Sequence, residues 1–85
     1  MRRFSERERE ITDRFFLALD TVIASGRIRG LQTFTRMHGL NQGNVSTLKN
    51  HRERCGLKPE MLSYLAEDFG VSCEWLLTGR GEMFT

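Results

Sequence analysis

The polar residues between positions 41 and 50 have types and spacing that favour a specific chemistry. Apart from two apolar residues, one glycine and one lysine, every side chain in this stretch is an uncharged hydrogen-bonding group. A glutamine such as Gln42 can present a donor and an acceptor together to an adenine edge, while Ser46 and Thr47 can bond several bases or touch a thymine methyl group. The chemistry that we expect from this stretch is therefore recognition of bases through hydrogen bonds.

The charge of the chain is distributed unevenly, although its net value is only +2. Residues 1–26 carry as many acids as arginines, and residues 59–85 carry five acids against one arginine. Residues 27–58 hold seven cations against a single acid, a net charge of +6. A basic segment of this kind favours binding to a polyanion such as nucleic acid, and a solvated run of charge is the alternative interpretation.

The length and composition limit the classes of protein to consider. Eighty-five residues with 39% apolar side chains are enough for one small core of packed helices. The longest apolar runs are far shorter than the roughly 20 residues that span a bilayer, and the N-terminus has no apolar signal segment. We therefore expect a cytoplasmic protein with no membrane partner.

Metal binding and catalysis both have little support in the sequence. His51 and Cys55 are four residues apart and Cys73 is a conceivable third ligand, but no second ligand pair completes a zinc site. We find no glycine-rich phosphate loop, no carboxylate pair in an apolar setting and no nucleophile with a plausible base. The expectation is a protein without enzymatic activity, cofactor, metal or small-molecule ligand.

Capping residues and apolar residues at helical spacing predict an all-α fold of five helices. Ser5 and Glu8 have the spacing of a capping box, and apolar residues then recur at helical spacing as far as Ile23, before Gly26. A second helix is predicted over residues 31–38, with Leu31, Phe34 and Met37 facing inward. The capping box and Gly26 therefore mark the start and the end of the first predicted helix.

Three more helices follow the turn that Gly39 predicts. Asn41 is a favourable N-cap for the polar helix of residues 42–50, and Pro59 suits the first turn of a fourth helix. Ser72 caps a short fifth helix, in which Trp75, Leu76 and Leu77 are expected to pack into the core. We expect residues 1–10 to form an extension with the start of the first helix, and residues 11–85 to form the domain.

The arrangement of a short helix, a glycine turn and a helix with a polar outer face is typical of a helix-turn-helix, whose second helix enters the major groove of DNA. The chain also closes with the sequence GVSCEWLLTGRG at residues 70–81. With these two features it resembles the lambda-repressor-like helix-turn-helix domains of the Cro/CI type, in particular the phage CI repressor branch. The resemblance covers residues 12–84 and implies a compact five-helix DNA-binding domain of a transcriptional regulator.

The resemblance also implies roles for single residues. The positions that match base contacts in the family are Gln42, Gly43, Ser46 and Thr47, with Asn44 as a further candidate. Phosphate contacts are expected from Arg36, Asn41, Lys49, Arg52 and Arg54, and Arg27, Arg29 and Lys58 are additional candidates.

The sequence departs from the family pattern at three positions. Leu31 stands where the family often has a phosphate-binding glutamine, and Thr35 stands where an alanine usually permits close packing of helices. His38 replaces an aliphatic residue before the glycine. We expect His38 to be a partly buried packing residue rather than a ligand or a pH switch.

The expected function is that of a sequence-specific regulator that binds double-stranded DNA, of the phage or mobile-element repressor type, acting as a homodimer. Met83 and Phe84 are candidate dimer contacts near the C-terminus. The alternative is a protein-interaction module, such as an adaptor or anti-repressor, that retains a helix-turn-helix fold without binding DNA.

Overall fold

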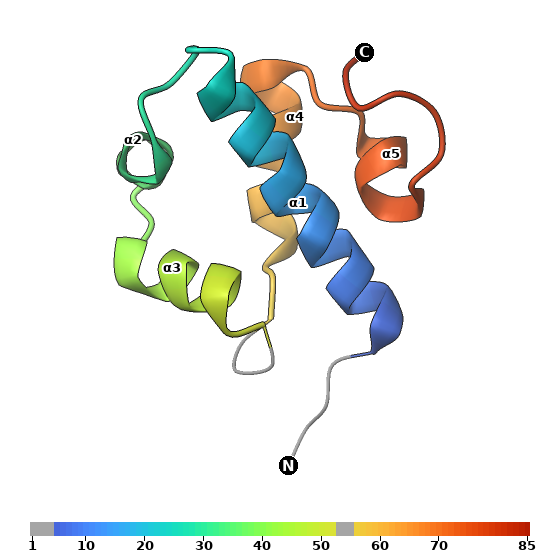
Figure 1. The fold of residues 1–85 in the computed structure, drawn as a ribbon, viewed down its shortest axis with the longest axis horizontal. Helices are drawn as coiled ribbons and strands as arrows, with labels where there is room; N and C mark the ends of the chain where they lie inside the picture. The colour runs from blue at the N-terminus through green and yellow to red at the C-terminus, as the bar shows by residue number, and fades with distance from the viewer. Residues whose placement is uncertain (1–4, 53–55) are drawn as a thin grey trace.

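A computed structural model describes residues 5–52 and 56–85 of the protein. The described residues form five α-helices, as predicted: α1 (Glu6–Ala24), α2 (Leu31–Met37), α3 (Gln42–Asn50), α4 (Pro59–Phe69) and α5 (Cys73–Thr78). Helix α1 runs through the middle of the molecule, with α2 and α3 on one side and α5 on the other (Figure 1). The helix-turn-helix pair is therefore separated from the C-terminal segment by the long first helix.

Three helices begin at the residues that the sequence predicted as caps. The side-chain oxygens of Ser5, Asn41 and Ser72 each accept a hydrogen bond from the backbone N–H three residues later. The Glu8 carboxylate completes the capping box of α1 by accepting from the Ser5 N–H at 3.4 Å. These bonds satisfy N–H groups that have no partner inside the helix, which is why the caps fix where each helix starts.

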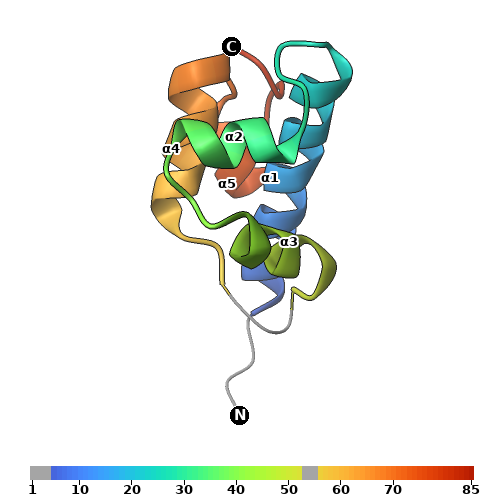
Figure 2. The same ribbon diagram turned by 90° about the vertical axis from the view of Figure 1, so that its left-hand side faces the viewer.

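The turn between α2 and α3 depends on Gly39, which has a φ of +63°. L-residues with a Cβ rarely adopt this left-handed conformation, so glycine allows the chain to reverse sharply. Helix α2 ends one residue earlier than predicted, because His38 is its C-cap and has a non-helical φ of −116°. After the reversal, α3 lies below α2 and in front of the lower part of α1 (Figure 2).

The core is built on one face of α1 and is closed on the helix-turn-helix side by Phe34. The Phe34 side chain is completely buried, and its ring centroid lies 6.0 Å from that of Phe15 and 6.4 Å from that of Tyr64. It therefore joins α2 to both α1 and α4. The apolar residues buried with it are Phe15, Phe16, Ala18, Leu19, Val22, Ile28, Val45, Leu48, Met61, Leu65, Phe69, Val71 and Leu76.

Two residues that were predicted to face inward are exposed. Met37 is 50% exposed, because the inward side of α2 is formed by Phe34 and Thr35, with His38 one turn further on. The Thr35 hydroxyl is buried without cost because it donates to the Gln32 carbonyl at 3.0 Å. Leu77 is also about half exposed, since α5 packs on the core through Leu76, which is fully buried, and Trp75, which is partly buried.

Two arginines bind carbonyl groups at the ends of other helices. Arg14 donates from Nε to the Leu76 carbonyl at 2.8 Å and from Nη2 to the Leu77 carbonyl at 3.2 Å, near the C-terminus of α5. Arg27 donates to the Phe69 carbonyl at the end of α4 and lies 5.2 Å from the centre of the Phe69 ring. Cations in these positions stabilise the unpaired carbonyls of a helix end.

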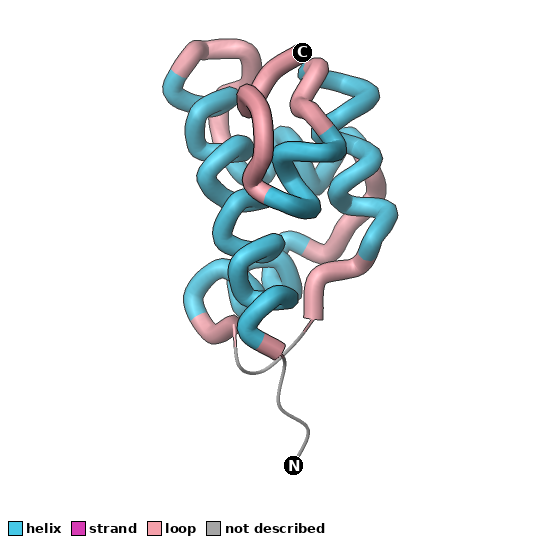
Figure 3. The backbone as a smooth tube through the Cα atoms, turned by 90° about the vertical axis from the view of Figure 1, so that its right-hand side faces the viewer, coloured by secondary structure: helices cyan, strands magenta, loops and turns pink. Residues whose placement is uncertain are grey.

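The C-terminal residues pair with the linker between α4 and α5, a feature that the sequence did not predict. Val71 and Phe84 form an isolated antiparallel β-bridge, and the Ser72 N–H donates to the Met83 carbonyl at 2.7 Å. Figure 3 shows this segment as loop, like the connections between the helices. Met83 and Phe84, the candidate dimer contacts, are half-buried against the core of their own domain.

None of the helices within the described ranges combines the length and the apolar character needed to cross a membrane.

Candidate nucleic-acid interface

Helix α3 presents its polar side to solvent because two apolar residues hold the other side against the core. Val45 is 5% exposed and Leu48 is 3% exposed. The five residues predicted as base contacts all lie on this one helix. Gln42, Gly43 and Asn44 are exposed, and Ser46 and Thr47 are half-buried. The structure therefore brings the predicted base-contact set together at the surface of the molecule.

The residues of α3 differ in how directly they face solvent. Each residue advances an α-helix by about 100°, so the side opposite Val45 and Leu48 is centred on Gly43 and Asn50. Asn50 is exposed on this central line, but the sequence-based set of base contacts did not include it. The signal was present in the sequence, since Asn50 lies seven residues after Gly43, which is two helical turns.

Asn41 and Gly43 form the exposed start of α3. The Asn41 side-chain oxygen accepts from the Asn44 N–H at 3.0 Å, so its amide NH₂ group remains to donate outward. A Cβ at position 43 would lie 3.1 Å from the Asn41 side-chain oxygen. Glycine at this position therefore leaves room for the capping hydrogen bond. Because it has no side chain, it also lets a ligand come close to the helix backbone.

Thr47 uses part of its hydrogen-bonding capacity inside the helix. Its hydroxyl donates to the Gly43 carbonyl at 2.9 Å. The oxygen lone pairs and the methyl group stay available for an outside partner. With Asn41, Asn44 and Lys58, this residue also lines a shallow groove between α3 and the start of α4.

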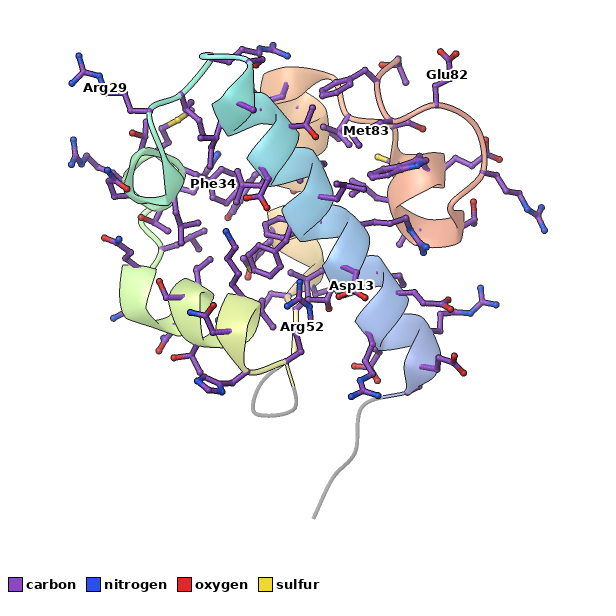
Figure 4. All side chains as sticks on the ribbon, in the orientation of Figure 1. Asp13, Arg29, Phe34, Arg52, Glu82 and Met83 are labelled. Atoms are coloured by element: carbon purple, nitrogen blue, oxygen red, sulfur yellow. The ribbon has the colours of Figure 1, made fainter. Side chains whose placement is uncertain are left out.

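The cations predicted to contact phosphate lie in three different settings. Arg36, near the end of α2, and Lys58, just before α4, are both exposed. Arg29 is exposed in the connection between α1 and α2 and points away from the body of the protein (Figure 4). Arg54 lies outside the described residues.

Lys49 and Arg52 are paired with carboxylates of α1. Lys49 Nζ lies 3.2 Å from Asp20 Oδ1, and Arg52 Nε lies 2.7 Å from Asp13 Oδ1. The latter two atoms are close enough for an ion pair but are not aligned for a hydrogen bond. Figure 4 shows Arg52 and Asp13 directed toward each other in the space between α1 and the end of α3.

Arg52 has further partners that hold it within the domain. Its guanidinium group lies 5.1 Å from the centre of the Phe16 ring and donates to the Lys49 carbonyl. The side chain is 28% exposed. Binding a phosphate would require Arg52 to leave Asp13, and its predicted phosphate contact stays a prediction. Arg27, a further candidate, is exposed and contacts Phe69 at the end of α4, and its predicted phosphate contact also stays a prediction.

His38 fixes the turn of the helix-turn-helix to α4. Its ring stacks on that of Tyr64, with centroids 3.8 Å apart and planes inclined by 5°. Its Nε2 atom lies 2.6 Å from Asp68 Oδ2, and its side chain is 15% exposed. The predicted packing role of His38 is confirmed. The polar contact with Asp68, thirty residues away in the chain, was not predicted.

Within residues 5–52 and 56–85, no group of three or more potential metal-ligating side chains lies close enough to hold a metal ion. Cys55, which belongs to the conceivable zinc set, is outside these ranges.

Comparisons of the chain with models of protein families, with curated proteins and with solved structures give no match.

Proposed function

We propose that the protein is a sequence-specific regulator that binds double-stranded DNA, of the phage or mobile-element repressor type. The observation that carries this proposal is the outer face of α3. It is polar, uncharged along its centre and exposed, and it follows α2 and a glycine turn in the chain. A helix in this setting fits the roughly 12 Å width of the major groove.

The residues of α3 have the hydrogen-bonding groups that base recognition requires. Gln42 is exposed at the first position of the helix, where a side chain reaches furthest toward the floor of the groove. Its amide can pair with an adenine through both a donor and an acceptor. Ser46 and Thr47, one turn further along, offer a hydroxyl and a methyl group to the next bases.

The cations around α3 support binding to the DNA backbone. Arg36 and Lys58 are exposed on the two elements that flank α3, and Lys49 lies on α3 itself. Contacts with phosphate fix the position of a protein on the duplex and make binding sensitive to salt. The three cations therefore supply the sequence-independent part of the proposed affinity.

Two copies of a domain this small, bound to half-sites about 34 Å apart on one face of the duplex, would provide useful affinity. We propose a homodimer on DNA for this reason, and a cytoplasmic location because a repressor of this type must reach its DNA. Because Met83 and Phe84 pack against their own core, the dimer contact is not assigned to these two residues.

An NMR titration tests where DNA binds. Adding a duplex of about 20 base pairs to ¹⁵N-labelled protein is expected to shift and broaden amide signals of α3 and of Arg36 and Lys58. Signals of α5, on the far side of α1, should change little (Figure 1). The amides of Leu76 and Thr78 serve as internal controls in the same spectra.

Changes that are confined to α5 and the C-terminal segment would contradict the proposed interface. An absence of change at every amide would contradict DNA binding itself. The second result would favour the alternative of a protein-interaction module that retains this fold.

A further inference from the structure

The end of α3 is joined to α1 by two ion pairs that lie one above the other. Asp13 and Asp20 are seven residues apart and share one face of α1, while Lys49 lies in the last turn of α3 and Arg52 lies two residues after the end of α3. We call Asp13–Arg52 the inner pair and Asp20–Lys49 the outer pair. The carboxylates of α1 thus neutralise two cations beside the proposed DNA-binding face.

The inner pair is held more firmly than the outer pair. Arg52 also lies over the Phe16 ring and donates to a backbone carbonyl, so several contacts must break before it can move. Lys49 has only Asp20 as its partner among the described contacts, at 3.2 Å. Asp13 of the inner pair is itself 63% exposed, so the firmer hold of that pair comes from the contacts of Arg52. The Lys49 and Asp20 side chains of the outer pair are 40% and 53% exposed. Exposed pairs of this kind contribute little free energy and are easily exchanged.

We propose that Asp20 competes with DNA phosphate for Lys49. In the free protein the Lys49 ammonium group is bound by the Asp20 carboxylate, and in the complex it transfers to a phosphate oxygen. The inference rests on the proposed function, which it extends by naming a residue that limits the affinity. Asp20 is on α1, outside the helix-turn-helix, and belongs to neither set of predicted DNA contacts.

Two consequences follow from this competition. Phosphates carry no sequence information, so Asp20 lowers the affinity for all duplexes by the same factor and leaves the preference among them unchanged. Salt screens the exposed outer pair, so the influence of Asp20 decreases as the salt concentration rises.

The substitution Asp20→Asn tests the proposal, measured by fluorescence anisotropy on a labelled random duplex of about 20 base pairs. We expect binding to tighten about two- to fivefold at about 50 mM salt and less at about 200 mM. Glu67→Gln is the matched control, because it removes one exposed negative charge from α4. A gain equal to that of the control would overturn the inference.

A double-mutant cycle with Lys49→Ala separates competition from direct repulsion between Asp20 and DNA. If Asp20 acts through Lys49, Asp20→Asn has no more effect than the control once Lys49 is replaced by alanine. A gain that persists in the Lys49→Ala background would show repulsion and overturn the inference. Wild-type protein that binds no duplex would refute the proposed function together with the inference. Wild-type binding without an Asp20 effect would refute the inference alone.

Discussion

Replacing Phe34 with alanine is expected to destabilise the domain by about 3–5 kcal/mol. The Phe34 ring is completely buried and contacts the aromatic rings of Phe15, His38 and Tyr64. Alanine at this position leaves a cavity where α1, α2 and α4 meet. Since small domains have a total stability of only about 5–15 kcal/mol, this one change removes a large share of it.

Thermal and urea unfolding followed by circular dichroism measure the effect of Phe34→Ala. The melting temperature is expected to fall by more than about 12 °C, at about 4–8 °C per kcal/mol for a domain of this size. Met37→Ala is the matched control on the same helix, because Met37 is half exposed, and it should change the stability by less than about 0.5 kcal/mol. Equal losses from the two variants would contradict the described packing of α2.

Replacing Gln42 with alanine is expected to weaken binding to the preferred DNA sequence by about 1–3 kcal/mol, which is about 5- to 150-fold. Binding to random duplex should be nearly unchanged, because the Gln42 amide is neutral and adds little to phosphate attraction. The substitution should also leave the fold intact, since Gln42 is exposed and Asn41 supplies the cap of α3.

Competition binding with specific and random duplexes at one salt concentration gives the ratio of affinities that this prediction concerns. Gln32→Ala is the control, because Gln32 is an exposed glutamine on α2, outside the proposed base-contact face. The control should preserve the ratio, whereas Gln42→Ala should reduce it. An equal loss on both duplexes for Gln42→Ala would refute its role in base recognition.

The helix starts and the turn were predictable because they depend on residues near each other in the chain. Ser5, Asn41 and Ser72 each bond a backbone group only three residues away. Gly39 provides a backbone conformation that residues with a Cβ rarely adopt. Local chemistry of this kind is visible in the sequence before any tertiary contact is known.

The facing of the short helix α2 was predicted less well. Apolar spacing favoured Met37 as an inward residue, yet the structure places Thr35 and His38 toward the core. A helix of seven residues has too few apolar positions to define its buried side. Contacts with α4, namely the stacking of His38 on Tyr64 and its bond to Asp68, decide the orientation instead.

The candidate site shows the same division between local and distant effects. The polar face of α3, including Asn50, followed from helical spacing alone, although Asn50 was not among the predicted base contacts. The partners of Lys49 and Arg52 did not, because Asp20 and Asp13 are 29 and 39 residues away in the chain. The sequence therefore contains no sign that two of the predicted phosphate-contacting cations are paired with carboxylates of α1.

Selection from a pool of random duplexes tests the central claim most directly. The purified protein would be mixed with the pool at about 150 mM salt, and the retained DNA would be sequenced. We predict enrichment of an inverted repeat whose two halves are about one helical turn apart, as a homodimer requires. Retention of weakly bound, salt-sensitive DNA with no enriched sequence would contradict a sequence-specific regulator.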